Sequence, residues 1–345
     1  MKTRDNRIQW IDRAKFIGIF LVILGHCSIP VYLKVWIYSF HMPLFFFISG
    51  SLNKFNFQTS YHDVFRKKTR TLIIPYFFFG IVTYLFWLLV HSKYGSPHDV
   101  STPFYIPLLG LFYSNGFGEW MVFNQPLWFL TCLFSTEILF LSTIKISPNY
   151  SRFIIEISIC LLAGFTFSYL HAPRLPWGLN IALVSISFYW LGWFYANRLS
   201  QPFYEKWSKL KLLVMTLLFL ILSVVLSFMN GRVDMNGGVF NNPIFYMAAA
   251  SSGLFFVVLT AIIIPSNRVI EFWGRETLII LGFHLMGLSG IKFFIGKIFG
   301  FTNYIYEDAI LANVMLSLLT LICFIPVIHF LNRYFPFLVG KKKAI

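Results

Sequence analysis

Two histidines and a lysine near the start of the chain have the residue types and spacing that proton transfer inside a membrane requires. Lys15 and His26 lie in one apolar run, and His41 opens the next run, at Phe40-His41-Met42-Pro43-Leu44. An imidazole titrates near neutral pH and can take a proton from a hydroxyl group. Ionisable residues cost at least about 2.5 kcal/mol at the centre of a bilayer, so they usually face a protein interior and mark a pathway or a reaction site.

The spacing of Lys15 and His26 places both side chains on one face of a helix. A helix turns by about 100° per residue, so positions eleven apart return to within about 20° of each other and lie about 16 Å apart along the axis. Lys15 is expected near one membrane face, and His26 deeper in the membrane. The connection to the next run is short, so His26 and His41 are expected on the same side. For each histidine the alternative is a structural hydrogen bond or an interfacial position.

Further polar residues occur in or beside the later apolar runs. Glu137 lies well inside the fourth run, where a carboxylate needs a partner or a proton. It could pair with the first run or orient a histidine, and a purely structural pair is an equal alternative. His284 lies in the middle of another run. Trp128 belongs either to an interfacial aromatic belt or to a wall on which a sugar stacks. Glu119 lies in the long stretch 92–125, whose length is typical of binding loops. Trp128, Glu119 and His284 are the predicted substrate-binding residues.

A basic cluster precedes Ile74-Pro75-Tyr76. Guanidinium and ammonium groups suit phosphate binding. Basic residues before a membrane span are also ordinary determinants of topology that contact anionic lipids, so both interpretations stay open. The cluster consists of Arg66, Lys67, Lys68 and Arg70.

Composition places all of these residues in an integral membrane protein. The 345 residues are 57% hydrophobic and 12% charged, whereas soluble domains average roughly 25% charged residues. The net charge of +15 does not indicate a nucleic-acid partner, because the basic residues are confined to short segments between apolar runs. The cysteines lie in apolar segments without the spacing of a metal site, so no metal is expected.

The apolar runs predict an all-α bundle of about ten transmembrane helices, at about 20 apolar residues per crossing. The whole chain, 1–345, is expected to form a single transmembrane domain. The predicted cores are 15–31, 36–52, 71–91, 126–144, 153–170, 178–196, 211–229, 243–264, 277–299 and 309–331.

The distribution of basic residues predicts the orientation of the bundle. If the N-terminus is cytoplasmic and the spans alternate, all but six of the 28 Lys and Arg residues lie on the inner side, as the positive-inside rule requires. We therefore predict cytoplasmic termini in a multi-pass protein of the inner or plasma membrane, in contact with membrane lipids. The six outer residues are Lys34, Lys93, Arg174, Arg232, Lys292 and Lys297.

Several motifs form a pattern along most of the chain. They are Asp12-x-x-Lys15, Leu21-Val22-Ile23-Leu24-Gly25-His26, Phe40 to Gly50, Arg66 to Pro75, Pro126 to Leu130, and Gly274-Arg275-Glu276-Thr277-Leu278 with His284. This pattern resembles the acyltransferase-3 family of membrane O-acyltransferases, which has about ten spans. The resemblance implies an acyl-CoA donor, expected to be acetyl-CoA, on the cytoplasmic side. It also implies an acceptor hydroxyl on a cell-surface or lipid-linked glycan, reached from the outer side.

The resemblance also suggests roles for individual residues. The family's paired basic residue and histidine correspond to Lys15 and His26, although the family usually has Arg at the first position, and Lys lacks its bidentate fork. The basic cluster, with Lys15, is then expected to hold the phosphates of CoA. His26, oriented by His41 or Glu137, is expected to act as general base on a sugar hydroxyl. A covalent acyl-histidine relay is a variant of this mechanism.

Two other functions fit parts of the sequence. A transporter for a glycan or small solute would use His26, His41 and Glu137 as a proton relay, although the inverted repeats common in transporters are not visible. A binding or sensor protein would use the fold without chemistry. Among enzymes, an acyl group larger than acetyl also stays open.

Overall fold

The structure is an all-α bundle, as predicted. The computed structural model describes residues 9–91, 101–147, 149–198, 207–300 and 307–341. Within these ranges, nine helices are long and apolar enough to cross a membrane. The same ranges contain no β-strand, only an isolated bridge between Asp234 and Val239. The protein is therefore a multi-pass membrane protein.

The observed helices follow the predicted spans in order along the chain. Short 3₁₀ segments precede α8 (η3, Gln125–Leu127) and α10 (η4, Pro176–Gly178) and follow α15 (η6, Pro336–Val339). The helices are α1 (Gln9–Gly25), α2 (Val31–Ser51), α3 (Tyr61–Lys68), α4 (Ile74–Phe86), α7 (Tyr105–Tyr113), α8 (Trp128–Ile146), α9 (Tyr150–Tyr169), α10 (Leu179–Arg198), α11 (Lys209–Asn230), α12 (Pro243–Ile263), α13 (Arg268–Arg275), α14 (Thr277–Phe299) and α15 (Ile310–Tyr334).

The first span differs from its predicted bounds of 15–31. Helix α1 has 17 residues and ends at Gly25, because the chain turns before Pro30, which occupies the N-cap position of α2. Helix α2 in turn begins at Val31 and continues through Pro43 to Ser51. The prediction that His41 opens the second span was therefore wrong, since His41 lies in the middle of α2.

Two regions contain more helix than predicted. Helix α3 follows the N-cap residue Ser60. It joins α4 through a π-helical turn, η1 (Thr69–Ile73). A second π-helical turn, η2 (Trp87–His91), follows α4. The basic cluster therefore lies on a helix that leads into the span. The predicted loop 92–125 includes the short helix α7, and its residues 92–100 lie outside the described ranges.

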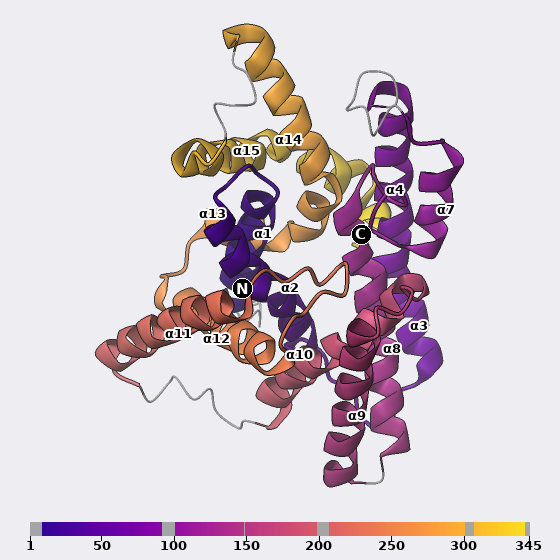
Figure 1. Cartoon of the computed structure of the whole chain (residues 1–345), viewed down its shortest axis with the longest axis vertical. Helices are drawn as coiled ribbons and strands as arrows, with labels where there is room; N and C mark the ends of the chain where they lie inside the picture. Colours follow the sequence, from indigo (N-terminus) through magenta and orange to yellow (C-terminus); the bar gives the residue numbers. More distant parts are fainter. Residues whose placement is uncertain (1–8, 92–100, 148, 199–206, 301–306, 342–345) are drawn as a thin grey trace, which may run out of the picture.

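Helix α2 lies at the centre of the bundle and packs against α1, α10, α11 and α12. Its contact with α10 is a close approach of two backbones. A Cβ atom at Gly192 would collide with the carbonyl of Phe47, and one at Gly50 would collide with the carbonyl of Tyr189. Small residues allow such approaches between membrane helices. Figure 1 shows α8 and α9 on one side of this centre and α11 with α12 on another.

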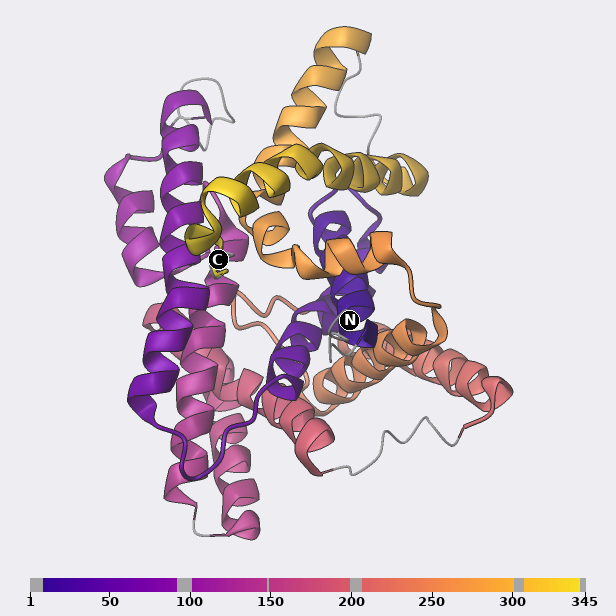
Figure 2. The same ribbon diagram turned by 180° about the vertical axis from the view of Figure 1, so that it is seen from behind.

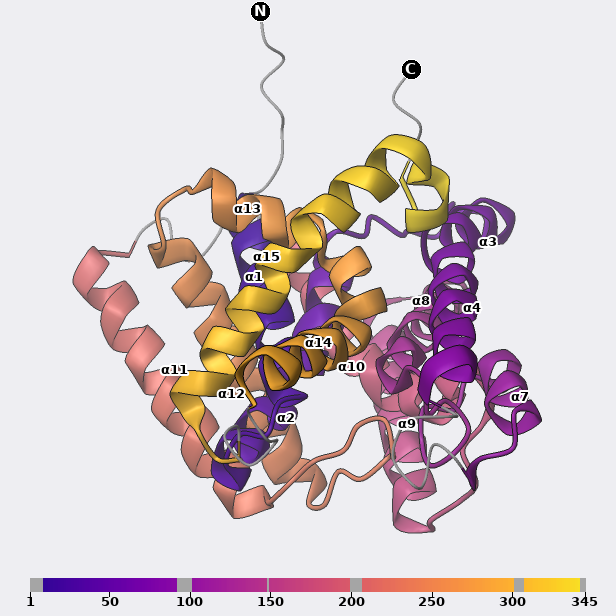
Figure 3. The same cartoon turned by 90° about the horizontal axis from the view of Figure 1, so that it is seen from above.

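Helices α14 and α15 complete the bundle beside α1. Figure 2 shows α15, in yellow, crossing the face next to the indigo helix α1. In Figure 3, the start of α1, helices α3 and α13, and the end of α15 lie at one end of the bundle. We call this the basic end, because α3 and α13 carry basic residues of the predicted inner side. The connection between α1 and α2 lies toward the opposite end, with the loop 231–242.

Candidate functional site

A cavity of about 160 Å³ is lined by two histidines, His26 and His41. We call it the histidine cavity. Helices α1, α2 and α14, segment η3, the start of α8 and the loop 231–242 all contribute to its wall. Its lining residues are Val22, His26, Tyr38, His41, Met42, Gln125, Pro126, Trp128, Arg232, Asp234, Met235, Asn236 and Leu281.

His26 is the first residue after α1, rather than a residue inside a longer helix. Its backbone N–H still bonds to the carbonyls of Val22 and Ile23, at 3.3 and 3.1 Å, so the helical winding extends to this position. The side chain is exposed to the cavity that it lines. Its ring centroid is 5.1 Å from that of His284. His26 therefore meets both the open space and a second imidazole.

His41 reaches the same cavity from the middle of α2. Its Nδ1 lies 2.8 Å from the carbonyl oxygen of Ile37, and its ring is 5.0 Å from that of Tyr38. A carbonyl oxygen only accepts, so the Nδ1 of a neutral His41 carries the proton. The Nε2 atom of His41 is then a proton acceptor.

His284 lies behind His26 and does not line the cavity. It is fully buried in α14, and its Nδ1 lies 2.9 Å from the carbonyl oxygen of Leu281. Its Nε2 has no hydrogen-bond partner among the described residues. The same argument assigns the proton to Nδ1 and leaves Nε2 as a bare acceptor. The structure thus places His284 against His26, not on the wall where a bound substrate would lie.

A second cavity, of about 180 Å³, lies beside the first and contains Lys15. We call it the lysine cavity. Met42 and Leu281 belong to the walls of both cavities. On α1, Lys15 and Ile19 line the lysine cavity, and Val22 and His26 line the histidine cavity. The helical face that carries Lys15 and His26 therefore runs along both cavities. The other residues of the lysine cavity are Phe45, Ile48, Ser49, Thr71, Leu72, Phe129, Leu130, Leu133, Thr277 and Leu278.

The basic cluster lies at the basic end, near the lysine cavity. Arg66 and Lys67 are exposed. Arg70 donates a hydrogen bond to the backbone carbonyl of Lys341, at 3.3 Å, and its neighbour Thr71 lines the lysine cavity. Lys68 instead forms an ion pair with Glu137, with the nitrogen 2.6 Å from the carboxylate oxygen.

Glu137 is not placed beside the histidines. Its side chain is 1% exposed and accepts hydrogen bonds from Lys68 and, at 3.4 Å, from the Tyr189 hydroxyl. Tyr189 in turn accepts from Asn53. Glu137 therefore joins α8 to α3 and α10, because the cation that neutralises it comes from the basic cluster and not from the first span. This geometry does not orient His26.

The three residues predicted to bind the substrate, Trp128, Glu119 and His284, lie apart in the structure. Trp128 lines the histidine cavity, whereas Glu119 is exposed on the segment after α7 and belongs to the wall of neither cavity. With His284 behind His26, only Trp128 of these three faces the cavity.

The loop 231–242 supplies cavity residues that the sequence analysis missed. Arg232, Asp234 and Asn236 line the histidine cavity. Asn236 is held in place because it accepts a hydrogen bond from Arg174 at 2.6 Å and donates one to the carbonyl of Gly116 at 2.7 Å. The available signal was a charged pair, Arg232 and Asp234, in a polar loop between two apolar runs.

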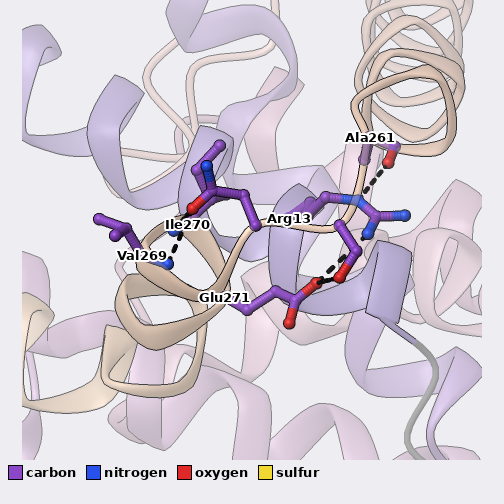
Figure 4. A network of polar contacts seen from close by, with 7 residues as sticks. Arg13, Ala261, Val269, Ile270 and Glu271 are labelled. Atoms are coloured by element: carbon purple, nitrogen blue, oxygen red, sulfur yellow. Dashed lines mark hydrogen bonds and ion pairs between the residues drawn. The ribbon is translucent and has the colours of Figure 1, made fainter.

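A buried ion pair fixes the start of α1. Arg13 Nε donates to the carbonyl of Ala261 at 2.7 Å, and its Nη1 lies 3.4 Å from the Glu271 carboxylate. Figure 4 shows this contact between α1, α12 and α13. The side chain of Asn267 caps α13 by accepting hydrogen bonds from the backbone N–H groups of Val269 and Ile270. The arrangement sets the position of α1, and with it the positions of Lys15 and His26.

The fold and the cavities define a class: a multi-pass membrane protein with a histidine-lined cavity beside an apolar one. The chain matches the acyltransferase-3 family model, described as an acyltransferase domain, over residues 8–337, and it belongs to this family. The match covers nearly the whole chain and confirms the resemblance seen in the motifs. No curated protein and no solved structure matched the chain. The protein is therefore a membrane acyltransferase.

Proposed function

We propose that the protein transfers an acyl group, acetyl in the simplest case, from cytoplasmic acyl-CoA to a hydroxyl of a cell-surface or lipid-linked glycan. One observation supports this most directly. The α1 face from Lys15 to His26 lines two adjacent cavities of different character. A largely apolar cavity near the basic end suits the donor, and a polar cavity with aromatic side chains suits a sugar.

The donor enters from the basic end. Coenzyme A carries several phosphate groups, and exposed Arg66 and Lys67, with Arg70 and Lys15, provide cations for them. Lys68 contributes less, because Glu137 already neutralises it. The pantetheine arm extends through the lysine cavity, and the thioester reaches the boundary at Met42 and Leu281. Methionine is flexible enough to move aside there.

The reaction needs one proton acceptor at this boundary. As the acceptor oxygen attacks the thioester carbonyl carbon, His26 removes the hydroxyl proton. The tetrahedral intermediate then collapses with cleavage of the carbon–sulfur bond, and the imidazolium of His26 returns the proton to the sulfur of CoA. The acyl-histidine variant would instead form a bond from His26 nitrogen to the acyl carbon before the hydroxyl attacks.

The neighbouring histidines support His26 in this step. Both carry their proton on Nδ1, so each offers a basic Nε2. His284, buried against His26, is a positioning residue that holds the His26 ring in place through their 5.1 Å ring contact. His41, on the cavity wall, can receive a hydrogen bond from the acceptor.

Substitution of His26 tests the proposal. In a deletion strain complemented with His26→Ala, we expect ester-linked acetyl on the surface glycan to fall by about 10²–10⁴-fold, the contribution typical of general acid–base catalysis. The measurement is mass spectrometry of the glycan at equal amounts of membrane-inserted protein. The matched control is His329→Ala, because His329 is an exposed histidine of α15 that bonds to the carbonyl of Ile325, stacks on Phe272 and lines neither cavity. Wild-type acetylation in the His26→Ala strain would contradict the proposal.

Purified protein separates this function from transport. Incubation with acetyl-CoA and the surface glycan is expected to release free CoA thiol and to add one acetyl mass per modified hydroxyl. Flux of a solute across liposomes that does not depend on acetyl-CoA would favour the transporter instead. The geometry gives the transporter less support, since Glu137 lies with Lys68 rather than with the histidines.

A further inference from the structure

Two arginines from two different loops lie at or behind the wall of the histidine cavity. Arg232 lies in the loop 231–242 and lines the cavity itself. Arg174 lies between α9 and η4 and donates its Nη1 hydrogen to the side-chain oxygen of Asn236, at 2.6 Å. Since Asn236 also lines the cavity, both guanidinium groups are close to the space beside His26.

Arg232 has hydrogen-bond donors to offer. Its guanidinium lies over the Tyr38 ring, with the central carbon 5.4 Å from the ring centroid. Its side chain has no hydrogen-bond acceptor or carboxylate partner in the described part of the chain. A guanidinium held over an aromatic ring keeps its planar fork of N–H groups, which matches a carboxylate or phosphate in a bidentate geometry.

Arg174 adds an unusual feature. Its central carbon lies 5.6 Å from the Trp128 ring centroid, and Trp128 is a cavity residue. Its Nε and Nη2 are buried and lack a hydrogen-bond partner within the described ranges. Leaving charged donors buried and unpaired is costly. Arg174 does not line the cavity itself, so its guanidinium adds positive charge behind the wall that Trp128 and Asn236 form.

The balance of charge around the cavity is positive. Asp234 is the one carboxylate among the lining residues, and its oxygen accepts a hydrogen bond from the Gly237 N–H at 3.0 Å. Lys34 lies close enough for its charge to act on both His26 and Arg232. Asp308 offsets part of the Lys34 charge. Lys292 adds to it. Four cations, Arg174, Arg232, Lys34 and Lys292, therefore lie in or around the cavity wall with two carboxylates, Asp234 and Asp308.

We infer that the acceptor carries an oxyanion, a carboxylate or a phosphate, and that Arg232 binds this group beside His26. The inference rests on the proposed function, because it takes the histidine cavity as the acceptor site. Arg174 acts through Asn236 and Trp128 as a positioning residue. Two kinds of acceptor present such a group: an acidic sugar with its own carboxylate, and a sugar phosphate such as the head of a lipid-linked saccharide.

Binding of three matched sugars tests the inference. The full chain in lipid nanodiscs is titrated with radiolabelled methyl glucoside, methyl glucuronide and methyl glucoside 6-phosphate, and dissociation constants are measured by equilibrium dialysis. We expect wild-type protein to bind one or both anionic sugars about tenfold or more tightly than the neutral one, with a preference that shrinks as salt rises. The preferred anion identifies the source of the oxyanion.

Variants connect this preference to Arg232. Arg232→Gln is expected to lose the anionic preference, so that it binds the two anionic sugars no more tightly than methyl glucoside. The charge-matched control is Lys297→Gln, since Lys297 is an exposed residue of α14 that lines neither cavity; this variant should keep the preference. Similar binding or no binding of all three sugars in wild type, or an intact preference in Arg232→Gln, would overturn the inference.

One further variant separates this inference from the proposed function. His26→Ala should keep the anionic preference and lose acetyl transfer. If His26→Ala keeps both, the catalytic proposal fails while the anion site stands.

Discussion

At the scale of single residues, the buried acid Glu137 shows that the partner of a side chain decides whether it has a catalytic or a structural role. A carboxylate deep in an apolar run is compatible with proton chemistry beside the histidines and equally with a structural ion pair. In the structure, its partner is Lys68, which lies 69 positions earlier in the chain. The pair joins the basic helix α3 to α8, so Glu137 contributes to the structure and Lys68 is a weaker candidate for phosphate binding.

The pair makes a prediction about stability. Glu137→Gln leaves the charge of Lys68 without its partner in a largely buried site, and removing one member of a buried pair typically costs about 3–5 kcal/mol. We expect a lower thermal midpoint of the purified protein, with acetyl transfer per folded molecule near that of wild type. The double variant Lys68→Met/Glu137→Leu should recover most of the stability. Unchanged stability with lost transfer would instead place Glu137 in the reaction.

At the scale of helices, nine of the ten predicted spans correspond to helices long and apolar enough to cross a membrane in the described residues, whereas the first, 15–31, corresponds to the shorter helix α1. Runs of about 20 apolar residues are a strong signal, and the order of the predicted spans is the order observed. The signal does not contain the turn before Pro30, which ends α1 at Gly25 and moves His41 to the middle of α2. Lys15 and His26 still lie on one helical face, as the eleven-residue spacing predicted, because the N–H of His26 still bonds to the carbonyl of Val22 and continues the helical winding.

The contact between α2 and α10 makes a second prediction about stability. An added methyl group at Gly192 would collide with the backbone of α2 at Phe47, so Gly192→Ala must separate two helices and is expected to lose about 1–3 kcal/mol. The control is Gly290→Ala in α14, where a Cβ would meet no atom within 4 Å. That variant should be neutral or slightly stabilising, because alanine favours a helix over glycine. Thermal unfolding in detergent compares the two, and equal stability would contradict the close packing.

At the scale of the whole molecule, the part of the histidine cavity formed by the loop 231–242 could not be predicted from local patterns. Arg232, Asp234 and Asn236 reach the cavity only because the loop 231–242 is held by contacts with distant segments, such as the bond from Asn236 to Gly116. A loop without periodicity carries no signal for such contacts. The donor side was easier, since Lys15 lies on a regular helix and its direction follows from helical geometry.

The arrangement of the two ends predicts a labelling pattern. In a variant without native cysteines, a cysteine at Asp63 in α3 should react with a membrane-impermeant maleimide only after cells are opened. One at Val239 in the opposite loop should react in intact cells. Both positions are exposed, so access depends on the side of the membrane. Reaction of the Asp63 cysteine in intact cells would contradict cytoplasmic termini.

The boundary between the two cavities, formed by Met42 and Leu281, has a consequence for what must cross the membrane. In the proposed reaction, neither the nucleotide carrier nor the saccharide has to travel through the bilayer, since only a two-carbon fragment passes between them. The thioester is used up on the side where it is made, and its chemical energy appears as an ester on the other side. Such a protein modifies the exterior of a cell without exporting a cofactor and without opening a leak for ions.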